Sequence, residues 1–573
     1  MNVLGIGGMA YRDSTAALVT DGRLVAAVSE ERVTRRKHQG GFPWRAAAAC
    51  LDSAGLDWKD LDRVAVANNP WVRLRDQVMD WYGEGFFAST AFKVHHIFHD
   101  EIRDLVDYLK AIETIRRDHD LEVEVVPHHQ SHLAASFYLS GWEEAALLNV
   151  DGRAVLSTSA AGVGRGTTIE TLHREEMPHS LGLLYAAVTD FLGFHDADDE
   201  FRVMSISSLG EPAYLAQAHE LVRLGPDGTY ALNEEFFAYH EGRAYLSDRF
   251  PEVFGAARRP GDPITDRHRD LAASLQRLVV DTALHIAKDL KDRTGLDRLC
   301  LSGGVAQNWV FNGTLVREGP FAEVTILPTA GDEGTAAGAA LEVTHQAGVP
   351  RGPRLRTASL GPSFSDDVVV EELRRRLLPV DPVDDPEETT ADLLAEGRLV
   401  GRFAGRMEFG PRTLGGRSIL ADPTRPDTRE RLVRGVKRRE RYHPFGLSIT
   451  AESVAEWFEE PRPSPFMLIY GKIRPEKRGL LPAVLHVDGT ARYHTVSRDS
   501  DPGFHRLLRK FEERRGHPVL LNTSLNRPGE PVACTPGDAL DCFWGSGLEA
   551  MMLGRCLVRK DGIPSQVRTV AGR

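Results

Sequence analysis

Two stretches of this chain, about 130 residues apart, follow the same pattern of apolar runs and an Asp-Gly pair. In the first stretch the pair is Asp21-Gly22, and in the second it is Asp151-Gly152, which follows Ala145–Val150. An Asp-Gly pair between β-rich runs predicts a hairpin turn. The flanking runs of the first stretch are Val3–Gly7, Ser14–Val19 and Leu24–Val28. The repeat therefore predicts a duplicated α/β core.

Strand–loop–helix junctions follow in the same part of the chain. Leu271–Leu290 has the apolar spacing of a helix, and Leu299–Leu301 and Val324–Leu327 are expected as short buried strands. The first strand leads into Ser302-Gly303-Gly304, and the second leads through Thr329–Gly334 into an Ala/Gly-rich helix. Free backbone N–H groups gather at such helix starts, so these loops are candidate ligand sites.

Glycine and proline residues cluster between residues 346 and 365, which predicts an interdomain linker. We therefore expect one domain over residues 1–345 and a second over residues 366–573. Whether the last ~40 residues pack back on the first domain stays open at this point.

Composition narrows the class of protein. The 573 residues carry 70 Lys and Arg against 82 Asp and Glu, a formal charge of −12, which disfavours general coating of nucleic acid. Five cysteines without Cys-x-x-Cys spacing suit a reducing compartment and disfavour a thiolate zinc site. With no basic, apolar leader and no apolar run of about 18 residues, we expect a cytoplasmic protein with no membrane partner.

The segment Pro127-His128-His129-Gln130-Ser131-His132 is the sharpest chemical motif. His128 and His132 are four residues apart, so on a helix both imidazoles project from one face, as two ligands of one divalent metal require. Asp332, in the loop before the Ala/Gly-rich helix, is a plausible third ligand. An isolated pair with this spacing is more often a packed histidine cluster.

The second domain holds three further candidate stretches. Gly405–Ser418 places Arg412 and Arg417 among glycines, where guanidinium groups can grip phosphate or carboxylate. His486–His494 contains an Asp-Gly turn that would present Arg492 from a strand, and Leu521–Arg527 places Asn522 and Ser524 at a strand end. Each of the last two stretches alone is equally well explained by turn chemistry.

Taken together, these motifs resemble the NodU/CmcH-type carbamoyltransferases, which include antibiotic O-carbamoyltransferases. The resemblance spans nearly the whole chain. Its motifs include Glu30-Glu31-Arg32, the histidine segment above, Ser180–Tyr185, Ser302–Asn308, Asp332-Glu333-Gly334, Leu360–Phe364 and the three stretches of the second domain.

The resemblance implies an actin/Hsp70-like ATPase-type N-terminal domain, similar to the threonylcarbamoyl transferase of tRNA modification, followed by a YrdC-like α/β domain. It implies a divalent metal, commonly Fe²⁺, held by His128, His132 and Asp332. Gly303, Gly304, Asn308 and Glu333 would bind nucleotide in the N-terminal domain. The second domain would bind carbamoyl phosphate and ATP with Mg²⁺ and form carbamoyl adenylate; its candidate residues are Arg412, Arg417, Lys437, Arg492, Asn522 and Ser524. A small-molecule acceptor hydroxyl would then take the carbamoyl group.

The first domain departs from the family pattern at three places. Arg12-Asp13 stands where His-Asp is usual, and an arginine cannot serve as a general base near neutral pH. The usual Asp-Gly-x-Gly-Glu appears as Asp151–Val155, and a Lys-Val-Met motif appears as Arg202-Val203-Met204. Either a relocated base, with Asp13 and His195 as candidates, or an amine acceptor would accommodate the change at Arg12.

Two rival functions share the same domain types. One is a tRNA threonylcarbamoyl-type modifying enzyme, which the acidic total disfavours. The other is a non-catalytic protein that binds nucleotide and carbamoyl phosphate, motivated by Arg12 and Arg153. The sequence leaves open the acceptor, the metal and the oligomeric state.

Overall fold

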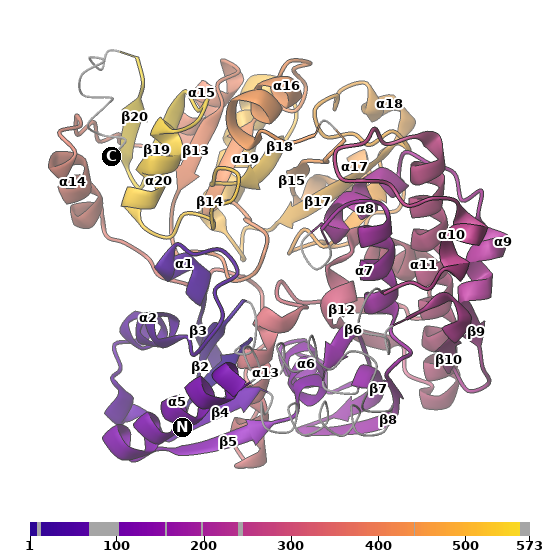
Figure 1. Ribbon diagram of the computed structural model, residues 1–573. Helices are drawn as coiled ribbons and strands as arrows, with labels where there is room; N and C mark the ends of the chain where they lie inside the picture. Colours follow the sequence, from indigo (N-terminus) through magenta and orange to yellow (C-terminus); the bar gives the residue numbers. More distant parts are fainter. Residues whose placement is uncertain are drawn as a thin grey trace. The chain divides into compact units, whose positions relative to one another are not determined.

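The computed structural model in Figure 1 describes residues 1–8, 13–67, 102–154, 157–195, 199–238, 245–440 and 442–561. The chain divides into two compact units. Unit 1 comprises residues 1–25, 39–47 and 56–354, and unit 2 comprises residues 26–38, 48–55 and 355–573. Two short N-terminal segments therefore belong to the unit that is otherwise built from the C-terminal part of the chain.

The first sheet of unit 1 has the order β3-β2-β1-β4-β5. β1 pairs antiparallel with β2 and parallel with β4, and β4 pairs parallel with β5. The strands are β1 (Asn2–Gly7), β2 (Thr15–Thr20), β3 (Arg23–Ser29), β4 (Arg63–Ala67) and β5 (Glu122–Val126). β2 and β3 flank Asp21-Gly22, so the first predicted hairpin is confirmed.

The second sheet of unit 1 repeats this topology. Its order is β12-β11-β6-β7-β8, in which β6 pairs antiparallel with β7 and parallel with β11, and β11 pairs parallel with β12. The strands are β6 (Glu144–Ala154), β7 (Ser157–Arg165), β8 (Thr168–Glu176), β11 (Arg298–Ser302) and β12 (Glu323–Ile326). In each sheet the first strand pairs antiparallel with the second and parallel with the fourth, so the predicted duplicated, actin/Hsp70-like core is present.

The second Asp-Gly pair does not form the predicted turn. Asp151 and Gly152 lie inside β6, where the pairing with β7 shifts register between Val150 and Ala154. The Asp151 carboxylate accepts hydrogen bonds from the backbone N–H of Gly152 and of Gly304, which holds this irregular segment in place. The pair therefore marks a β-bulge, a feature that often redirects a side chain next to a site.

Two helices bring the histidine motif to the loop before α13. α6 (His128–Tyr138) contacts α13 (Thr335–Gln346), which also packs on β1 and β4. A Cβ atom on Gly338 would lie 1.8 Å from the backbone oxygen of Ser131, so only glycine permits this approach of α13 to α6. Because α13 begins directly after Asp332 and its 3-10 turn, the approach places Asp332 near His132.

The remaining elements of unit 1 surround these sheets. The long helix α11 confirms the helix predicted over Leu271–Leu290 and extends it at both ends. The elements are α2 (Trp44–Ala54), which spans both units, α5 (Ile102–His119), α7 (Leu181–Phe191), α8 (Glu200–Ser207), α9 (Leu215–Ala218), β9 (Val222–Leu224), β10 (Tyr230–Leu232), α10 (Arg249–Phe254), α11 (Asp266–Thr294) and α12 (Trp309–Glu318).

Unit 2 is built on an eight-stranded mixed sheet of order β16-β17-β15-β18-β14-β13-β19-β20. The last two strands, near the C-terminus, pair in this sheet beside β13. The strands are β13 (Val400–Phe403), β14 (Arg417–Ala421), β15 (Gly446–Thr450), β16 (Ile469–Lys472), β17 (Thr490–Val496), β18 (Val519–Ser524), β19 (Ala550–Leu553) and β20 (Cys556–Arg559).

Helices cover one half of one face of this sheet. Side chains of α15 and α19 form a buried cluster with Leu420, Leu520 and Val496 of the sheet. The other half of the same face is polar and is described below. The helices of unit 2 are α1 (Glu30–Thr34), α14 (Asp366–Arg375), α15 (Pro386–Ala395), α16 (Thr428–Leu432), α17 (Val454–Trp457), α18 (Pro475–Arg478), α19 (Pro502–Arg515) and α20 (Pro536–Trp544).

Two expectations from composition can be compared with the structure. All five cysteines are buried and free, as the absence of a disulfide framework predicts. Among the described residues, none of the helices has both the length and the apolar character that crossing a bilayer requires.

Candidate functional site

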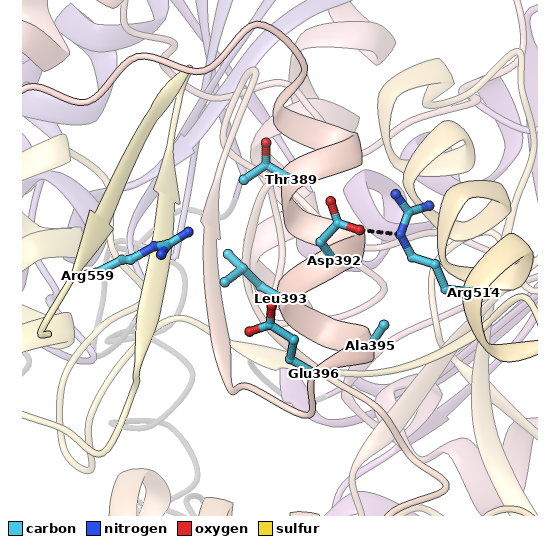
Figure 2. A pocket seen from close by; sticks show the side chains of 7 residues that line it. All are labelled: Thr389, Asp392, Leu393, Ala395, Glu396, Arg514 and Arg559. Carbon is cyan, nitrogen blue, oxygen red and sulfur yellow. Dashed lines mark hydrogen bonds and ion pairs between the residues drawn. The ribbon is translucent and has the colours of Figure 1, made fainter.

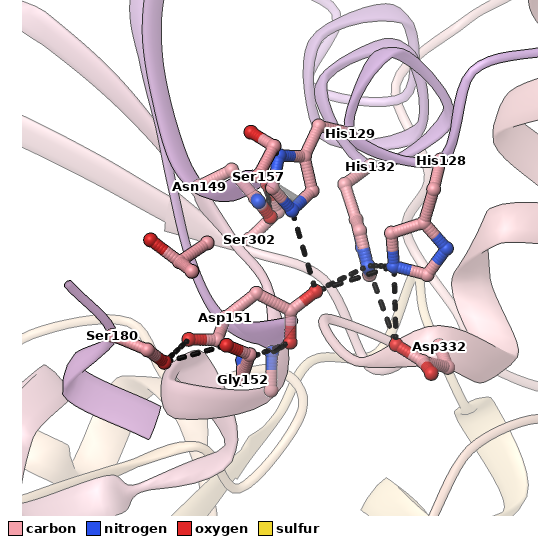
Figure 3. A network of polar contacts seen from close by, with 12 residues as sticks. His128, His129, His132, Asn149, Asp151, Gly152, Ser157, Ser180, Ser302 and Asp332 are labelled. Atoms are coloured by element: carbon pink, nitrogen blue, oxygen red, sulfur yellow. Dashed lines mark hydrogen bonds and ion pairs between the residues drawn. The ribbon is translucent and has the colours of Figure 1, made fainter. Parts of the chain in front are cut away.

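Two imidazoles and two carboxylates converge in unit 1 (Figure 3). The Nε2 atoms of His128 and His132 are 3.0 Å apart and lie 3.5 and 3.4 Å from Oδ1 of Asp332. The predicted trio is thus brought together by α6 and by the loop before α13. Figure 3 shows the two rings and the Asp332 carboxylate facing one point.

Asp151 is the fourth member of this cluster and was not among the predicted ligands. Its Oδ2 lies 3.2 Å from Nε2 of both His128 and His132, and the side chain is 8% exposed. One ligand atom from each of the four residues lies within 4.8 Å of the others. Two nitrogen and two oxygen donors are a set that Zn²⁺ and Fe²⁺ both accept, so these residues fit a divalent metal.

The electrostatics of the cluster are those of a site built for a cation. Burial acts to lower the pKa of His128, but the charge of Asp332 and the hydrogen bond that His128 donates to Asp151 outweigh it and raise the pKa to about 10. Burial of Asp151 is likewise outweighed by its hydrogen bonds with His128 and His132, which hold its pKa well below the usual range. Without a metal, a proton on His128 supplies positive charge that the carboxylates stabilise.

A third imidazole lies beside the cluster. Nε2 of His129 is 3.9 Å from Oδ2 of Asp151, and Nδ1 lies 2.9 Å from the hydroxyl of Ser157. Burial and the neighbouring His128 and His132 lower the pKa of His129 to about 3, although Asp151 acts in the opposite direction. His129 is therefore a neutral neighbour of the cluster.

Of the residues assigned to nucleotide in the N-terminal domain, Gly304 contacts this cluster and Glu333 directly follows one of its members. Gly303 has φ +94°, and the next residue, Gly304, donates its N–H to Asp151 at 3.0 Å. Asn308 accepts hydrogen bonds from the N–H groups of Val310 and Phe311 and so caps α12. Glu333 follows Asp332, and its backbone oxygen accepts a hydrogen bond from the Thr15 hydroxyl.

The proposed bases occupy separate positions. Arg12 lies outside the described residues. Asp13 has φ +56°, and His195 is exposed, with its backbone N–H donating to Asp199 at 3.1 Å. The four-residue cluster includes neither Asp13 nor His195.

In unit 2, the predicted Arg492, Asn522 and Ser524 share one face of the sheet. Side chains at alternate strand positions, and at paired positions of neighbouring strands, point to the same face. Asn522 of β18 pairs with Gly446 of β15. Two positions along β15, Ser448 pairs with His494 of β17, and Arg492 is two positions from His494 on β17. Asn522 donates to the Ser448 hydroxyl at 3.0 Å and to the backbone oxygen of Thr413 at 3.2 Å.

Lys437 reaches Ser524 from a π-helical turn over Val433–Lys437. Its Nζ donates to the hydroxyl of Ser524 and to the side-chain oxygen of Asn526, at 3.1 and 2.7 Å. Burial and the nearby Arg439 lower the pKa of Lys437 to about 7. π-Helical turns are rare and frequently occur at functional sites.

An arginine cluster surrounds Arg492. Burial, then Arg412 and Arg439, lower the pKa of Arg492, and burial, Arg412 and Arg429 lower that of Arg439 to about 10. Guanidinium groups that repel one another in a buried region are suited to hold a polyanion. Arg429 and Arg439 were absent from the predicted set. Their signal was the positive stretch Gly401–Arg441, which holds 12 Lys or Arg against five Asp or Glu.

Arg417 is placed differently from the other candidates. Arg417 and Ser418 are consecutive residues of β14, so their side chains point to opposite faces of the sheet. The Arg417 guanidinium lies 3.6 Å from the ring centre of Phe403. Its Nη atoms donate to the backbone oxygens of Ala404, Gly405 and Gly416. In this arrangement Arg417 organises the loop that carries Arg412 and Thr413.

A cavity of about 540 Å³ in unit 2 is separate from these residues (Figure 2). It lies against α15, α19 and β20, and its lining includes Asp392, Glu396, Arg514 and Arg559. Asp392 and Arg514 form an ion pair with Nε and Oδ1 2.6 Å apart. None of the predicted site residues lines this cavity.

Comparisons with known proteins cover both units. The family profile described as Carbamoyltransferase N-terminus matches residues 2–341, and the one described as Carbamoyltransferase C-terminus matches residues 391–560. "Nodulation protein NolNO" of Sinorhizobium fredii is 34% identical over 98% of this chain and 80% of its own length. "Nodulation protein NolO" of Bradyrhizobium diazoefficiens is 37% identical over 76% of this chain and 78% of its own.

A solved structure with a matching region is "T.kodakarensis HypF", with a TM-score of 0.33 and 15% identity, covering 61% of this chain and 48% of that chain. The fold assignment for unit 1 rests on the duplicated sheet topology within the chain itself.

Proposed function

Because the chain belongs to the carbamoyltransferase family, we propose that it is ATP-dependent and transfers the carbamoyl group of carbamoyl phosphate to a small secondary metabolite. In this proposal ATP, carbamoyl phosphate and one water molecule react in unit 2 to give carbamoyl adenylate, pyrophosphate and phosphate. A hydroxyl or an amine of the acceptor then attacks the carbamoyl carbon, and AMP leaves. The observation that carries the proposal is the cluster of mutually repelling guanidinium groups around the buried Arg492.

Fixed positive charge is what the first step requires. Carbamoyl phosphate and ATP bring several negative charges together, and preorganised donors stabilise them without reorganising during the reaction. Arg412, Arg439 and Arg492 supply guanidinium donors, and Lys437 supplies an ammonium donor next to Ser524. Mg²⁺ would accompany the ATP phosphates.

Unit 1 offers the residues for the transfer step. His128, His132, Asp151 and Asp332 would hold a divalent metal, with Fe²⁺ our first candidate. When bound, such an ion acts as a Lewis acid toward a carbonyl or phosphoryl oxygen. Gly152 and Gly304 keep the Asp151 carboxylate oriented through their N–H groups. Asp13 and His195 remain our candidates for the base that takes the acceptor's proton.

One experiment tests the whole proposal. The protein is incubated with ATP, Mg²⁺ and carbamoyl phosphate, and pyrophosphate release is followed. A panel of hydroxyl and amine metabolites is then added, and products are identified by mass spectrometry as gain of one carbamoyl group. Pyrophosphate release that depends on carbamoyl phosphate is expected. Its absence at every metal and pH tested would remove the adenylate step from the proposal.

The pyrophosphate assay and a gel shift together separate the two rival functions. A tRNA-modifying enzyme would shift bulk tRNA on a gel at moderate salt, where electrostatic binding to phosphates persists only for a basic surface. A non-catalytic binder would retain ligand without releasing pyrophosphate. Carbamoylation of one metabolite in the panel would establish both the transfer activity and the acceptor.

A further inference from the structure

His486 lies on the polar face of the sheet of unit 2, beside Arg492. Its Nδ1 is 3.0 Å from the hydroxyl of Thr490, the first residue of β17. Thr490 and Arg492 are two positions apart on that strand, so their side chains point to the same face. Arg492 and Arg429 are both among the charges that act on the imidazole. His486 is thus a neighbour of the arginine cluster.

The hydrogen bonds of the turn determine where the proton on this imidazole sits. The Thr490 hydroxyl donates its one hydrogen to Oδ1 of Asp488 at 2.7 Å. Toward His486 the same hydroxyl must therefore accept, so Nδ1 carries the ring hydrogen. Burial, with the charges of Arg492 and Arg429, lowers the pKa of His486 to about 4 despite Asp488, so the ring is neutral near pH 7. A neutral ring with hydrogen on Nδ1 has a bare acceptor at Nε2.

That acceptor is buried and unused. Among the residues that the structure describes, Nε2 of His486 has no hydrogen-bond partner. A buried polar atom without a partner is destabilising, so its persistence at a site points to a ligand group that completes it. For a ligand N–H group, the surrounding arginines offer no alternative acceptor, because a guanidinium only donates hydrogen bonds.

Carbamoyl phosphate has one donor group close to its phosphate. The amino group is attached to the carbonyl carbon, which is joined to phosphorus through one bridging anhydride oxygen. A hydrogen-bond acceptor for the amino group must therefore lie at the edge of the phosphate site. The amino hydrogens of adenine are much farther from the phosphates. Acetyl phosphate has a methyl group in place of the amino group and donates nothing.

We propose that Nε2 of His486 accepts a hydrogen bond from the amino group of carbamoyl phosphate and that this contact discriminates against acetyl phosphate. The inference rests on the proposed function and names the residue that selects its substrate. Sites that hydrogen-bond a substrate N–H reject an analogue that lacks it, because the buried acceptor is left unpaired.

The test compares His486→Leu with His486→Gln. Leucine keeps the approximate volume but has no acceptor, whereas the glutamine amide oxygen can replace Nε2. For each variant, kcat/KM for pyrophosphate release is measured with carbamoyl phosphate and with acetyl phosphate, and acetyl phosphate is also tested as an inhibitor. We expect the carbamoyl-to-acetyl ratio to fall at least tenfold in His486→Leu and to stay within threefold of wild type in His486→Gln.

A second variant guards against misfolding of the first. Thr490→Val removes the hydroxyl that holds the hydrogen on Nδ1, so the hydrogen can move to Nε2 and the acceptor is lost. The carbamoyl-to-acetyl ratio should fall at least threefold while the imidazole is still present. Asn522→Leu tests the alternative acceptor, because Oδ1 of Asn522 is also buried without a partner among the described residues.

The outcomes are separable. If wild type releases no pyrophosphate with carbamoyl phosphate, the proposed function fails. If wild type is active and the ratio is unchanged in both His486→Leu and Thr490→Val, this inference is overturned and the function stands. It is also overturned if Asn522→Leu alone lowers the ratio, or if His486→Leu instead loses discrimination between ATP and purine riboside triphosphate, which lacks the adenine amino group.

Discussion

The carboxylate of Asp151 lies 3.2 Å from Nε2 of His132, and both side chains are almost completely buried. Asp151 comes from β6 and His132 from α6, while Asp332 comes from a loop about 180 residues farther along the chain than Asp151. The cluster is therefore anchored on a strand, a helix and a loop of the duplicated core. Rigid elements of this kind hold ligands in place before a metal arrives.

We expect Asp151→Asn to weaken metal binding at least tenfold, because the amide brings no negative charge to balance the cation. The change is nearly isosteric, so folding should be retained. Metal content after dialysis and titration with Fe²⁺ or Co²⁺ measure the effect. Asp266→Asn, at a side chain that is 90% exposed, is the matched control and should bind metal like wild type. Equal metal content in the two variants would contradict the assignment of Asp151.

Metal affinity should rise with pH. The pKa of His128 is raised to about 10, so this imidazole carries a proton near neutral pH when no metal is bound, and the pKa of His132 is raised as well. A metal must displace such protons, and each displaced proton makes the affinity change about tenfold per pH unit below the pKa.

Isothermal titration at pH 6, 7 and 8, in buffers of different ionisation enthalpy, measures this linkage directly. Between one and two protons should be released for each metal ion bound at pH 7. In Asp332→Asn the release should fall, since the charge that raises the pKa of His128 is removed. Affinity that is independent of pH would show that the imidazoles are not protonated in the metal-free protein.

Local patterns in the sequence predicted the duplicated sheets and a helix over residues 271–290, which the structure extends to 266–294, because those patterns are repeated and periodic. The spacing of His128 and His132 predicted one helix face, and α6 supplies it. Asp151 was missed because an Asp-Gly pair is a turn signal, whereas here β6 continues through it as a bulge stabilised by Gly304. Only the pairing of β6 with other segments of the chain distinguishes a turn from a bulge at this position.

The same limit applies in unit 2. Arg412 and Arg417 have the same local setting of glycines and apolar residues, yet the structure turns the Arg417 guanidinium to backbone oxygens of its own loop. Arg439 was not among the predicted site residues, but it lies against Phe445 and acts on Arg492. Charge counts identify such a region, and tertiary packing decides which cations face inward.

Lys437 should make anion binding depend on pH. Because burial and Arg439 lower its pKa to about 7, its positive charge is present below pH 7 and is lost as the pH rises through that value. We expect the affinity for sulfate, an anion whose own charge is constant in this range, to fall several-fold between pH 6 and 8. Calorimetric titration with sulfate measures it.

In Lys437→Met this pH dependence should disappear, and pyrophosphate release with carbamoyl phosphate should fall at least a hundredfold. Lys472→Met is the matched control, since Lys472 is exposed at the end of the edge strand β16. It should keep both the affinity for sulfate and its pH dependence. A sulfate affinity that declines equally with pH in Lys437→Met would assign the titration to another group.

Removing one arginine from the cluster should stabilise the protein and weaken its substrate binding. Besides burial, Arg412 and Arg439 lower the pKa of Arg492, and Arg412 and Arg429 lower that of Arg439, which means that charges in this cluster repel one another when no anion is bound. We expect Arg439→Gln to raise Tm by about 2 °C or more in buffer without phosphate, consistent with relief of charge repulsion on the order of 1 kcal/mol.

The same variant should bind carbamoyl phosphate at least tenfold more weakly, so added phosphate should raise Tm in wild type but not in the variant. Arg438→Gln, at the exposed neighbouring residue, should change neither quantity, and a lower Tm for Arg439→Gln would show that this guanidinium serves packing rather than anion binding.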